Sequence, residues 1–530
     1  MVRLLLLMLT LSTLYRSDAK LSVKKAWLSD PSEQKKDITA LLRSLQAKDS
    51  ALENYITLTS EERQVFEGIG GSFMRAGAKV LNQMPPEVQD DILQDLFDQG
   101  DRGARFTLGK VPIAATDFGV PVWYSYAEEE QDESMPDFSI DYDLDEKEGF
   151  IPYVKRASKI VGQNIRLEAT MDYAPHWMLN TSTPLPEPDL NSTYLGHLAN
   201  YFLKYTQAME AHGAPIEYLS MFNENLDSYM FASYETCRDL LVNHVAPLFK
   251  RTPGAPKLTW SALPGRHASA VMSPPFYKLD GVAENIDVIF YHGYDCNDGP
   301  AEGMGWQCTD EDGSPKSGTN TTCPYLDRSA GEMKAFLNDF NSQGRQVWMT
   351  ELCYASEFAD YNPLKTGCPD IPRYDFQDAT QWAHMMFTDF NVIEANAWIY
   401  WNMILDTTGG PWLISPKHND PVKNPQQPVI IADPSTKQYW LTGCFYAMWH
   451  FGRINSGSTR VVVDAPGGEE SLYPTLSHVA FYDSSEDTYT IVLMNDDKDT
   501  HTMALGFPGS DEVVEVVLPA SSLATVTVTV

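Results

Sequence analysis

The chain is poor in positive charge. Its 530 residues hold 39 Lys and Arg against 72 Asp and Glu, which gives a formal net charge of −33 at pH 7. Such a surface would be repelled by nucleic acids and by anionic membranes, so neither is expected as an electrostatic partner. A lipid substrate remains compatible with this charge. Many carboxylates lose their charge as the pH falls towards 4, so the composition fits an acidic compartment or a saline exterior.

Long hydrophobic runs are also lacking beyond the first residues. Arg3 precedes a largely apolar stretch, Leu4–Leu14, which is followed by the small-residue sequence Ser17-Asp18-Ala19. This pattern predicts a secretory signal over residues 1–19, and Arg16 and Asp18 argue against a membrane anchor. We expect a secreted or lysosomal (vacuolar) glycoprotein without a transmembrane segment. Three glycosylation triplets agree with export, at Asn180, Asn191 and Asn320.

Cysteine is scarce, with seven in the chain and no C-x-x-C pair or alternation with His. A structural metal site is therefore not expected. In an oxidising compartment, one or two loop disulfides are the better interpretation, and the odd count leaves at least one thiol unpaired. The cysteines that gather in two loop-like stretches are Cys296, Cys308, Cys323, Cys353 and Cys368.

Several catalytic motifs are absent as well. The sequence has no G-x-S-x-G, no H-E-x-x-H and no G-x-x-x-x-G-K-[ST], and Gly68-Ile69-Gly70-Gly71 lacks the third glycine of a dinucleotide fingerprint. We therefore predict neither a metal nor a cofactor. Carboxylates remain as the candidate catalytic groups, and their position along the fold has to select among them.

Strand-like runs alternate with helix-like segments from about Gly68 to Asn402. Eight parallel strands in such an alternation predict a (β/α)8 barrel, and an open doubly wound sheet is the alternative. Apolar side chains at helical spacing support the helices, as in Leu195–Met209 and Val88–Phe97. The expected strands are Gly68–Met74, Arg105–Leu108, Ile165–Met171, Glu217–Phe222, Leu258–Leu263, Ile286–Tyr291, Gln346–Thr350 and Ala397–Trp401.

The pattern changes near Pro428 to short β-branched runs separated by Gly, Asp and Ser turns. Such runs indicate an antiparallel β-sandwich, to which Lys24–Leu28 and Tyr55–Leu58 could add strands from the other end of the chain. The predicted organisation is a signal (1–19), N-terminal sandwich strands (20–66), a catalytic barrel (67–430) and the sandwich (431–530). The sandwich runs are Arg460–Val463, His478–Tyr482, Tyr489–Met494, Val513–Leu518 and Ala524–Val528.

Two glutamates stand directly at the ends of predicted barrel strands. Glu224 follows strand four, and Glu351 follows strand seven. Catalytic side chains of such barrels lie at the carboxyl ends of the strands. Opposed carboxylates there suit glycoside hydrolysis, in which one carboxyl protonates the leaving oxygen and the other attacks the anomeric carbon. We predict Glu224 as the acid/base and Glu351 as the nucleophile of a retaining reaction.

Other residues at strand ends are candidates for sugar contacts. Asn223 precedes Glu224, the pair His292 and Tyr294 closes strand six, and Trp401 closes strand eight. A Tyr hydroxyl can hydrogen-bond and stabilise an ionised nucleophile, and a Trp face can carry a sugar ring. Trp398 points the opposite way from Trp401 in strand alternation, so we expect it to pack structurally.

An acidic stretch, Glu128–Glu148, resembles no complete binding motif. Within it, Asp141–Asp145 imitates a calcium loop, but Glu146 stands where that loop requires glycine. A solvated surface loop is the better interpretation.

Together these residues resemble glycoside hydrolase family 30, in particular its glucosylceramidases, over nearly the whole length after residue 19. The resemblance implies a (β/α)8 barrel with a β-sandwich built from both chain ends, and retaining hydrolysis of a β-glycoside with Glu224 and Glu351 in the roles given above. The stretches that carry it are Phe66–Gly71, Lys110–Ile113, Asp117-Phe118, Tyr124–Tyr126, Asp137–Ile140, Ala174–Met178, Asn223-Glu224, Thr350-Glu351, Trp401-Asn402, Gly409–Pro411 and Phe445–Met448.

Three positions depart from the pattern that this family carries. Arg75 stands in place of an Asp, Asp172 in place of a Trp, and Lys110 in place of an Arg. In the family these positions surround the glycone ring, so the resemblance implies the chemistry more firmly than the sugar. Asp172 is expected to contact substrate, and Arg75 and Asp172 could form an ion pair that reshapes the pocket.

The sequence thus predicts a retaining β-glycosidase that hydrolyses glucosylceramide or a related glycosphingolipid, with a possible peripheral contact to a membrane surface. The alternatives are a β-glycanase or β-xylosidase acting on soluble oligosaccharides, and a carbohydrate-binding protein without activity on the same scaffold.

Overall fold

The fold is described from a computed structural model. It describes residues 20–46, 54–119, 124–180, 189–225, 232–294, 326–341, 343–353, 372–376, 378–412, 425–465 and 476–530. The chain divides into two compact units, one formed by Glu67–Arg453 and the other by the residues up to Phe66 together with Ile454–Val530. The expected signal, the Asn320 triplet and the cysteines Cys296, Cys308, Cys323 and Cys368 lie outside the described residues.

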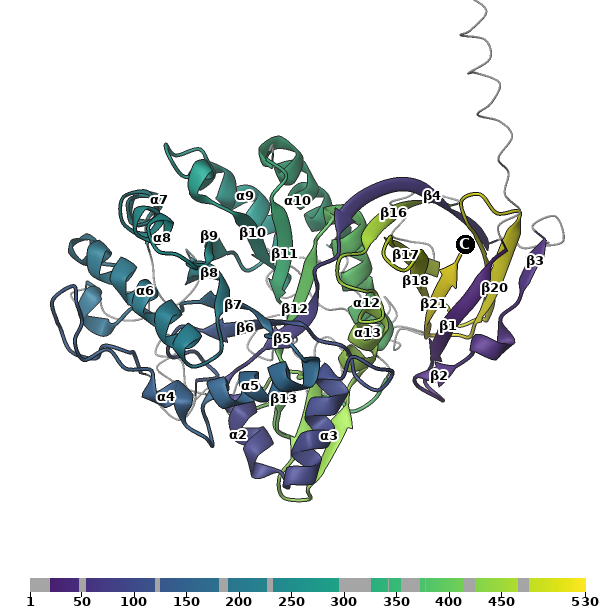
Figure 1. Ribbon diagram of the computed structural model, residues 1–530, viewed down its shortest axis with the longest axis horizontal. Helices are drawn as coiled ribbons and strands as arrows, with labels where there is room; N and C mark the ends of the chain where they lie inside the picture. The colour runs from purple at the N-terminus through teal and green to yellow at the C-terminus, as the bar shows by residue number, and fades with distance from the viewer. Residues whose placement is uncertain are drawn as a thin grey trace, which may run out of the picture. The chain divides into compact units, whose positions relative to one another are not determined.

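The larger unit is an eight-stranded parallel barrel with helices around it (Figure 1), as the sequence predicts. The order β10-β11-β12-β5-β6-β7-β8-β9 brings the first and last strands in that order together, and the amide of His292 donates to the carbonyl of Leu263 at this seam. The strands are β5 (Gly68–Ser72), β6 (Leu108–Pro112), β7 (Arg166–Thr170), β8 (Ile216–Asn223), β9 (Lys257–Ala262), β10 (Val288–His292), β11 (Gln346–Glu351) and β12 (Ala397–Asn402).

Amphipathic helices cover the outside of the barrel. The predicted helices are confirmed as α3 and α6, and α6 buries Leu198, Tyr201 and Met209 at the expected helical spacing. The helices of this unit are α2 (Arg75–Gln83), α3 (Pro86–Phe97), α4 (Asp141–Leu144), α5 (Phe150–Val161), α6 (Leu195–Ala211), α7 (Tyr234–Asp239), α8 (Ala246–Lys250), α9 (Arg266–Tyr277), α10 (Leu326–Phe340), α12 (Ala379–Thr388) and α13 (Gly443–Phe451).

Strand β5 explains the glycine-rich motif near residue 70. A Cβ atom on Gly70 would overlap the backbone carbonyl of Leu108 in β6, and one on Gly71 would overlap the Met403 side chain. The glycines therefore allow close approach inside the barrel wall, which is a packing requirement and not a phosphate site.

The second barrel strand lies further along the chain than predicted. The sequence places it at Arg105–Leu108, whereas β6 begins at Leu108. Arg105 has a left-handed φ of +59°, which no strand residue adopts, so the chain turns before the strand starts. The shift matters because it puts Lys110 inside the strand.

The smaller unit is a ten-stranded sheet that includes strands from both ends of the chain, in agreement with the predicted sandwich. Figure 1 shows purple β1 beside yellow β21, and the two pair antiparallel. Leu493, Val514 and Val526 are among its buried apolar residues. Its strands are β1 (Ser22–Ser29), β2 (Lys36–Asp37), β3 (Ser44–Gln46), β4 (Asn54–Val65), β16 (Thr459–Asp464), β17 (Leu476–Asp483), β18 (Thr488–Asn495), β19 (His501–Gly506), β20 (Glu512–Leu518) and β21 (Ser522–Thr529).

The sequence misses three strands of this sheet: the short β2 and β3, and β19, whose start at His501 and Thr502 is weakly apolar. Strand β19 pairs in parallel with β4, while the other strand pairs of this sheet among the described residues are antiparallel. The sequence also begins the sandwich at residue 431, but the compact barrel unit extends to Arg453. That extension holds α13 and a small sheet of β13 (Ile404–Leu405), β14 (Ile430–Asp433) and β15 (Gln438–Leu441).

None of the helices in the described ranges combines the length and the apolar character that a bilayer crossing requires.

Candidate active site

Glu224 and Glu351 come together at the carboxyl end of the barrel. Glu351 is the last residue of β11, and Glu224 directly follows β8. A carboxylate oxygen of each glutamate and a ring nitrogen of His292 all lie within 4.8 Å of one another. Glu224 has a left-handed φ of +48°, and its amide is fixed by the carbonyl of Ala262 at 2.9 Å. Such local strain is typical of functional positions that the surrounding fold holds in place.

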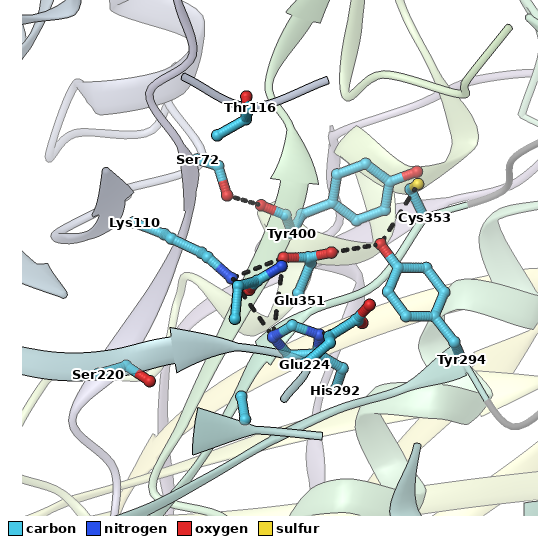
Figure 2. A network of polar contacts seen from close by, with 12 residues as sticks. Ser72, Lys110, Thr116, Ser220, Glu224, His292, Tyr294, Glu351, Cys353 and Tyr400 are labelled. Carbon is cyan, nitrogen blue, oxygen red and sulfur yellow. Dashed lines mark hydrogen bonds and ion pairs between the residues drawn. The ribbon is translucent and has the colours of Figure 1, made fainter. Parts of the chain in front are cut away.

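Glu351 is buried and bonded at both carboxylate oxygens (Figure 2). Lys110 Nζ donates to Oε2 at 2.6 Å, and the Tyr294 hydroxyl donates to Oε1 at 2.9 Å. Burial and nearby negative charge raise the pKa of Tyr294 well above its usual value, so its hydroxyl keeps the proton that it donates. Two donors on one buried carboxylate stabilise a negative charge there.

His292 links the two glutamates. Its Nδ1 lies 2.7 Å from Glu224 Oε1, and its Nε2 lies 3.3 Å from Lys110 Nζ. Burial, and then the charge of Lys110, lower the pKa of His292 well below its usual value, so the ring is neutral. Since an ammonium group only donates, Nε2 accepts from Lys110 and Nδ1 carries the proton that it donates to Glu224.

Lys110 supplies the positive charge of the site. Burial alone would lower its pKa, but the carboxylates of Glu351, Glu168 and Asp172 and the hydrogen bond to Glu351 raise it above the usual value. Its three N–H groups have three acceptors, because Asn223 Oδ1 is bound at 3.1 Å in addition to Glu351 and His292. We call Lys110, His292, Tyr294 and Glu351 the nucleophile network.

A metal ion is a poor fit to this cluster. Glu224, His292 and Glu351 have the residue types of a ligand set. However, the Lys110 ammonium already bonds both Glu351 and His292 Nε2. The one nitrogen of His292 that faces Glu224 carries its proton, which a metal ligand must not do.

The remaining predicted sugar contacts lie in the same region. The Asn223 side chain accepts a hydrogen bond from Lys110. Its backbone amide donates to the backbone carbonyl of Met171 at 2.8 Å, which ties the ends of β7 and β8 together. Trp401 is the second-last residue of β12, with Lys110 Nζ 5.2 Å from its ring centroid and the ring centroid of Phe118 at 6.4 Å in an edge-to-face arrangement. Both side chains are nearly buried beside the two glutamates.

Two further carboxyl groups lie on β7 and just beyond its end. Glu168, Thr170 and Asp172 alternate along the chain, so they share one face, and Glu168 stands opposite Lys110 in the strand register. Burial, with the charge of Glu351 adding and that of Lys110 opposing, raises the pKa of Glu168 and of Asp172 to about 7 each. We call the two carboxyl residues, together with Thr170 between them, the β7 acid row.

The predicted ion pair between Arg75 and Asp172 is wrong. Arg75 lies 3.9 Å from Asp143 and 3.6 Å from Glu148, and the charges that act on Asp172 are those of Lys110 and Glu351. Strand ends one and three, at which the two residues stand, are separated by β6 in the barrel.

Asp143 is an exception within the expected surface loop, since most acidic residues of Glu128–Glu148 are exposed. It lies in helix α4 and is fully buried, with hydroxyl donors from Tyr124 and Tyr126 at 2.5 Å each. Burial still raises its pKa to about 7. The two tyrosines, spaced two residues apart, fill both oxygens, so this carboxyl is a structural anchor of the loop after β6.

Trp398 packs structurally, as predicted. It is fully buried, and its Nε1 donates to Asp389 Oδ2 at 2.9 Å. Arg266 and Tyr291 bond the same carboxylate. Trp398 therefore belongs to a core network on the other side of β12 from Trp401.

Sequence reasoning missed Glu168 and gave Lys110 no role beyond a departure from the family. A signal for both exists in the sequence, since Lys110 is the one charge in β6 and Glu168 stands between the apolar residues Leu167 and Ala169 in β7. Cys353, one of the cysteines in the loop-like stretches for which disulfides were expected, has a buried thiol that lies 3.7 Å from the Tyr294 hydroxyl and 3.4 Å from Gln426 Oε1.

Comparison with known proteins finds likenesses in sequence and in fold. Residues 66–243 match the glycosyl hydrolase family 30 TIM-barrel domain. The chain is 25% identical over 436 residues to a Caenorhabditis elegans protein named "Putative glucosylceramidase 3", which covers 79% of this chain and 73% of that protein. It is also 27% identical over 259 residues to Endo-1,6-beta-D-glucanase BGN16.3 of Trichoderma harzianum, covering 45% of this chain and 50% of that protein.

Solved structures agree on the fold. SrfJ from Salmonella typhimurium has a TM-score of 0.73 at 17% identity, covering 95% of this chain and 98% of that chain. The endo-beta1,6-glucanase BT3312 has a TM-score of 0.72 at 17% identity, covering 96% and 99%. Identities this low speak for the fold alone, whereas the family domain and the sequence relatives add that residues 66–243 resemble the barrel domain of glycosyl hydrolase family 30.

Proposed function

We propose that this protein is a retaining β-glycosidase that hydrolyses the β-glucosyl linkage of glucosylceramide or a related glycosphingolipid. The observation that carries the reaction type is the pair of carboxylates at the ends of β8 and β11, with oxygens within 4.8 Å of each other. Retaining enzymes hold their two carboxyl groups about 5 Å apart, and inverting enzymes hold them further apart to admit a water.

In the first step, the Glu351 carboxylate attacks the anomeric carbon as the bond to the leaving oxygen breaks. Lys110 and Tyr294 hold Glu351 in one orientation, which favours this role. Glu224 gives its proton to the leaving oxygen. Because Glu224 Oε1 accepts from His292 Nδ1, the transferred proton resides on Oε2.

In the second step, Glu224 is ionised and takes a proton from water, whose oxygen attacks the anomeric carbon and releases Glu351. The side chain of Glu224 is 19% exposed and that of Glu351 is 6% exposed. The more accessible carboxyl suits the group that meets water, and the buried one suits the group that bonds the sugar. Asn223 and Trp401 are proposed to contact the sugar.

The lipid substrate is supported by the relatives. The protein "Putative glucosylceramidase 3" matches over most of both chains. We infer from the predicted signal that the enzyme works outside the cytosol, in an acidic compartment or outside the cell. Low pH would reduce its negative charge and so weaken repulsion from a membrane surface.

A second candidate is endo-hydrolysis of a β-1,6-glucan. It is favoured by the likeness to the enzyme of Trichoderma harzianum and by the fold-level likeness to BT3312.

Trapping with a panel of 2-deoxy-2-fluoro-β-glycosides tests the proposal. We expect a covalent adduct on the peptide that contains Glu351, found by mass spectrometry. Hydrolysis of labelled glucosylceramide in detergent micelles, compared with hydrolysis of a linear β-1,6-glucan, then separates the two substrates.

The matched variants are Glu351→Gln and Glu224→Gln. Both should lose turnover, and added azide should restore turnover only to Glu224→Gln, because a small nucleophile can replace the water that Glu224 activates. Unchanged turnover in Glu351→Gln would refute the nucleophile assignment. Release of the α-anomer first would refute retention.

A further inference from the structure

Asp172 lies between the two strands that hold the catalytic machinery. The amide of Ile113, after β6, donates to the carbonyl of Thr170 at 2.7 Å, and the amide of Asn223 donates to that of Met171 at 2.8 Å. These bonds place Asp172 between the end of β6, which carries Lys110, and the Asn223-Glu224 pair. Its charge interacts with those of Lys110 and Glu351.

The Oδ1 atom of Asp172 is buried without a hydrogen-bond partner among the described residues, and the residue is only 3% exposed. The donors around it are already used. Lys110 spends its three N–H groups on Glu351, Asn223 and His292, and Tyr294 donates to Glu351. The rest of the β7 acid row adds no fixed donor, because Glu168 and Thr170 also lack partners there.

A buried carboxyl group without a donor costs free energy, and proteins retain such groups where a ligand supplies the missing bond. A sugar ring carries hydroxyl groups, each of which can donate to a carboxyl oxygen. Asp172 is therefore positioned to bind one ring hydroxyl while the anomeric carbon faces Glu351.

We propose that Asp172 is a specificity residue that recognises one hydroxyl group of the glycone, and that it selects neutral sugars that carry this hydroxyl. The inference rests on the proposed glycosidase function and deepens it. Sites built to bind a hydroxyl reject analogues that lack it, because the polar group of the protein is then left unpaired.

The test is a double-mutant cycle in which one change is made at Asp172 and the other in the sugar. Aryl β-glucoside and its 2-, 3-, 4- and 6-deoxy analogues are compared in the wild type and in Asp172→Leu by kcat/KM. For one analogue, the wild type should lose about 30-fold, and Asp172→Leu should lose about the same with the parent sugar. The variant acting on that analogue should show no larger loss of kcat/KM than either change alone. Additive losses for every analogue would overturn the proposal.

Binding provides a readout that does not need turnover. Calorimetric titration of the polyhydroxylated piperidine deoxynojirimycin and its deoxy analogues into Glu351→Gln, with and without Asp172→Leu, should give the same non-additive pattern. This arm can succeed even if the glucosylceramide proposal fails. Failure of the glycosidase proposal itself appears separately, as unchanged turnover in Glu351→Gln.

Glu168→Gln is the matched control from the same row. It should leave the ratio between parent and deoxy sugar unchanged, because Glu168 lies below Asp172 on the strand and faces Lys110. Circular dichroism confirms folding of each variant. A preference for 2-amino-2-deoxyglucosides that grows above pH 7 would also overturn the hydroxyl assignment, because it would indicate a charge pair.

Discussion

The nucleophile network and the β7 acid row are buried side by side in one barrel, but they use their hydrogen-bonding capacity in opposite ways. The network draws Lys110, His292, Tyr294 and Glu351 from β6, β10, β11 and the turn after β10, and its donors meet acceptors. The row comes from one strand and its end, and buried carboxyl oxygens of Glu168 and Asp172 have no partners among the described residues. Groups from several strands can alternate donors with acceptors, whereas two like charges on one strand cannot satisfy each other.

Because of this difference, the nucleophile network is preorganised, whereas the β7 acid row is ready to bind a ligand. The network holds one carboxylate in a fixed orientation before substrate arrives, which is what a nucleophile needs. The row holds carboxyl groups that need protons at low pH or a ligand at any pH. Asp143 shows that burial alone is not the cause, since it is as deeply buried as Glu168 and still has two tyrosine donors.

The largest expected effect comes from breaking the network at its charge. Lys110→Met removes the cation that Glu351 bonds at 2.6 Å and leaves three carboxyl groups without a counter-charge. We expect kcat/KM on an aryl β-glycoside to fall about 1,000-fold, because breaking a buried pair costs roughly 4 kcal/mol. Lys110→Arg keeps the charge and should retain more activity than Lys110→Met. Loss of less than tenfold in Lys110→Met would show that the network does not depend on this ion pair.

Removing a carboxyl group from the β7 acid row should raise the stability of the folded protein at high pH. The pKa of Glu168 is raised to about 7 in the fold, so the folded state holds a proton that the unfolded state has released above its ordinary pKa near 4.5. Stability therefore falls as the pH rises from about 4.5 through 7. Glu168→Leu should gain roughly 3 kcal/mol in urea unfolding at pH 8 and much less at pH 4.5.

The matched variant for this prediction is Asp143→Leu. Asp143 also has a pKa raised to about 7, but its removal leaves the hydroxyls of Tyr124 and Tyr126 without an acceptor. It should lose stability at both pH values. Equal effects of the two variants would mean that partners do not distinguish these carboxyl groups.

A smaller effect is expected from removing the neutral donor of the network. Tyr294→Phe deletes the hydroxyl at 2.9 Å from Glu351 but leaves Lys110 in place. We expect kcat to fall about 30-fold with little change in KM, since a hydrogen bond to a charged group contributes roughly 2 kcal/mol. A larger loss than in Lys110→Met would reverse the ranking of the two donors.

The smallest effect is expected at the buried hydrogen bonds around Asp389, which lie away from the active site. Trp398→Phe removes one of the donors on Asp389 and retains Arg266 and Tyr291. Stability should fall by about 1 kcal/mol while KM stays constant. A change in KM would place Trp398 in contact with the sugar after all.

Much of this architecture could be predicted from sequence. The strand ends that carry Glu224 and Glu351 were visible because apolar runs stop there at an acidic residue. Since the strands of the barrel are parallel, both strand ends lie at the same end of the barrel. Lys110 was harder, since the left-handed turn at Arg105 moves the start of β6 in a way that the residue pattern does not show. Asp143 was misjudged because the ten other acidic residues of Glu128–Glu148 suggested solvent, and its two tyrosine partners lie 19 and 17 residues before it.

The sequence by itself determined the alternation of strands and helices, the sandwich from both chain ends and the two glutamates at strand ends, because these follow from local periodicity along the chain. Only the tertiary structure decided which charges become partners. Arg75 faces Asp143 and Glu148 and not Asp172. Lys110 spends its donors on Glu351, His292 and Asn223, and none of them goes to the β7 acid row. Hydrogen bonds and ion pairs require contact within a few ångströms, and the closing of the barrel brings residues hundreds of positions apart within that reach.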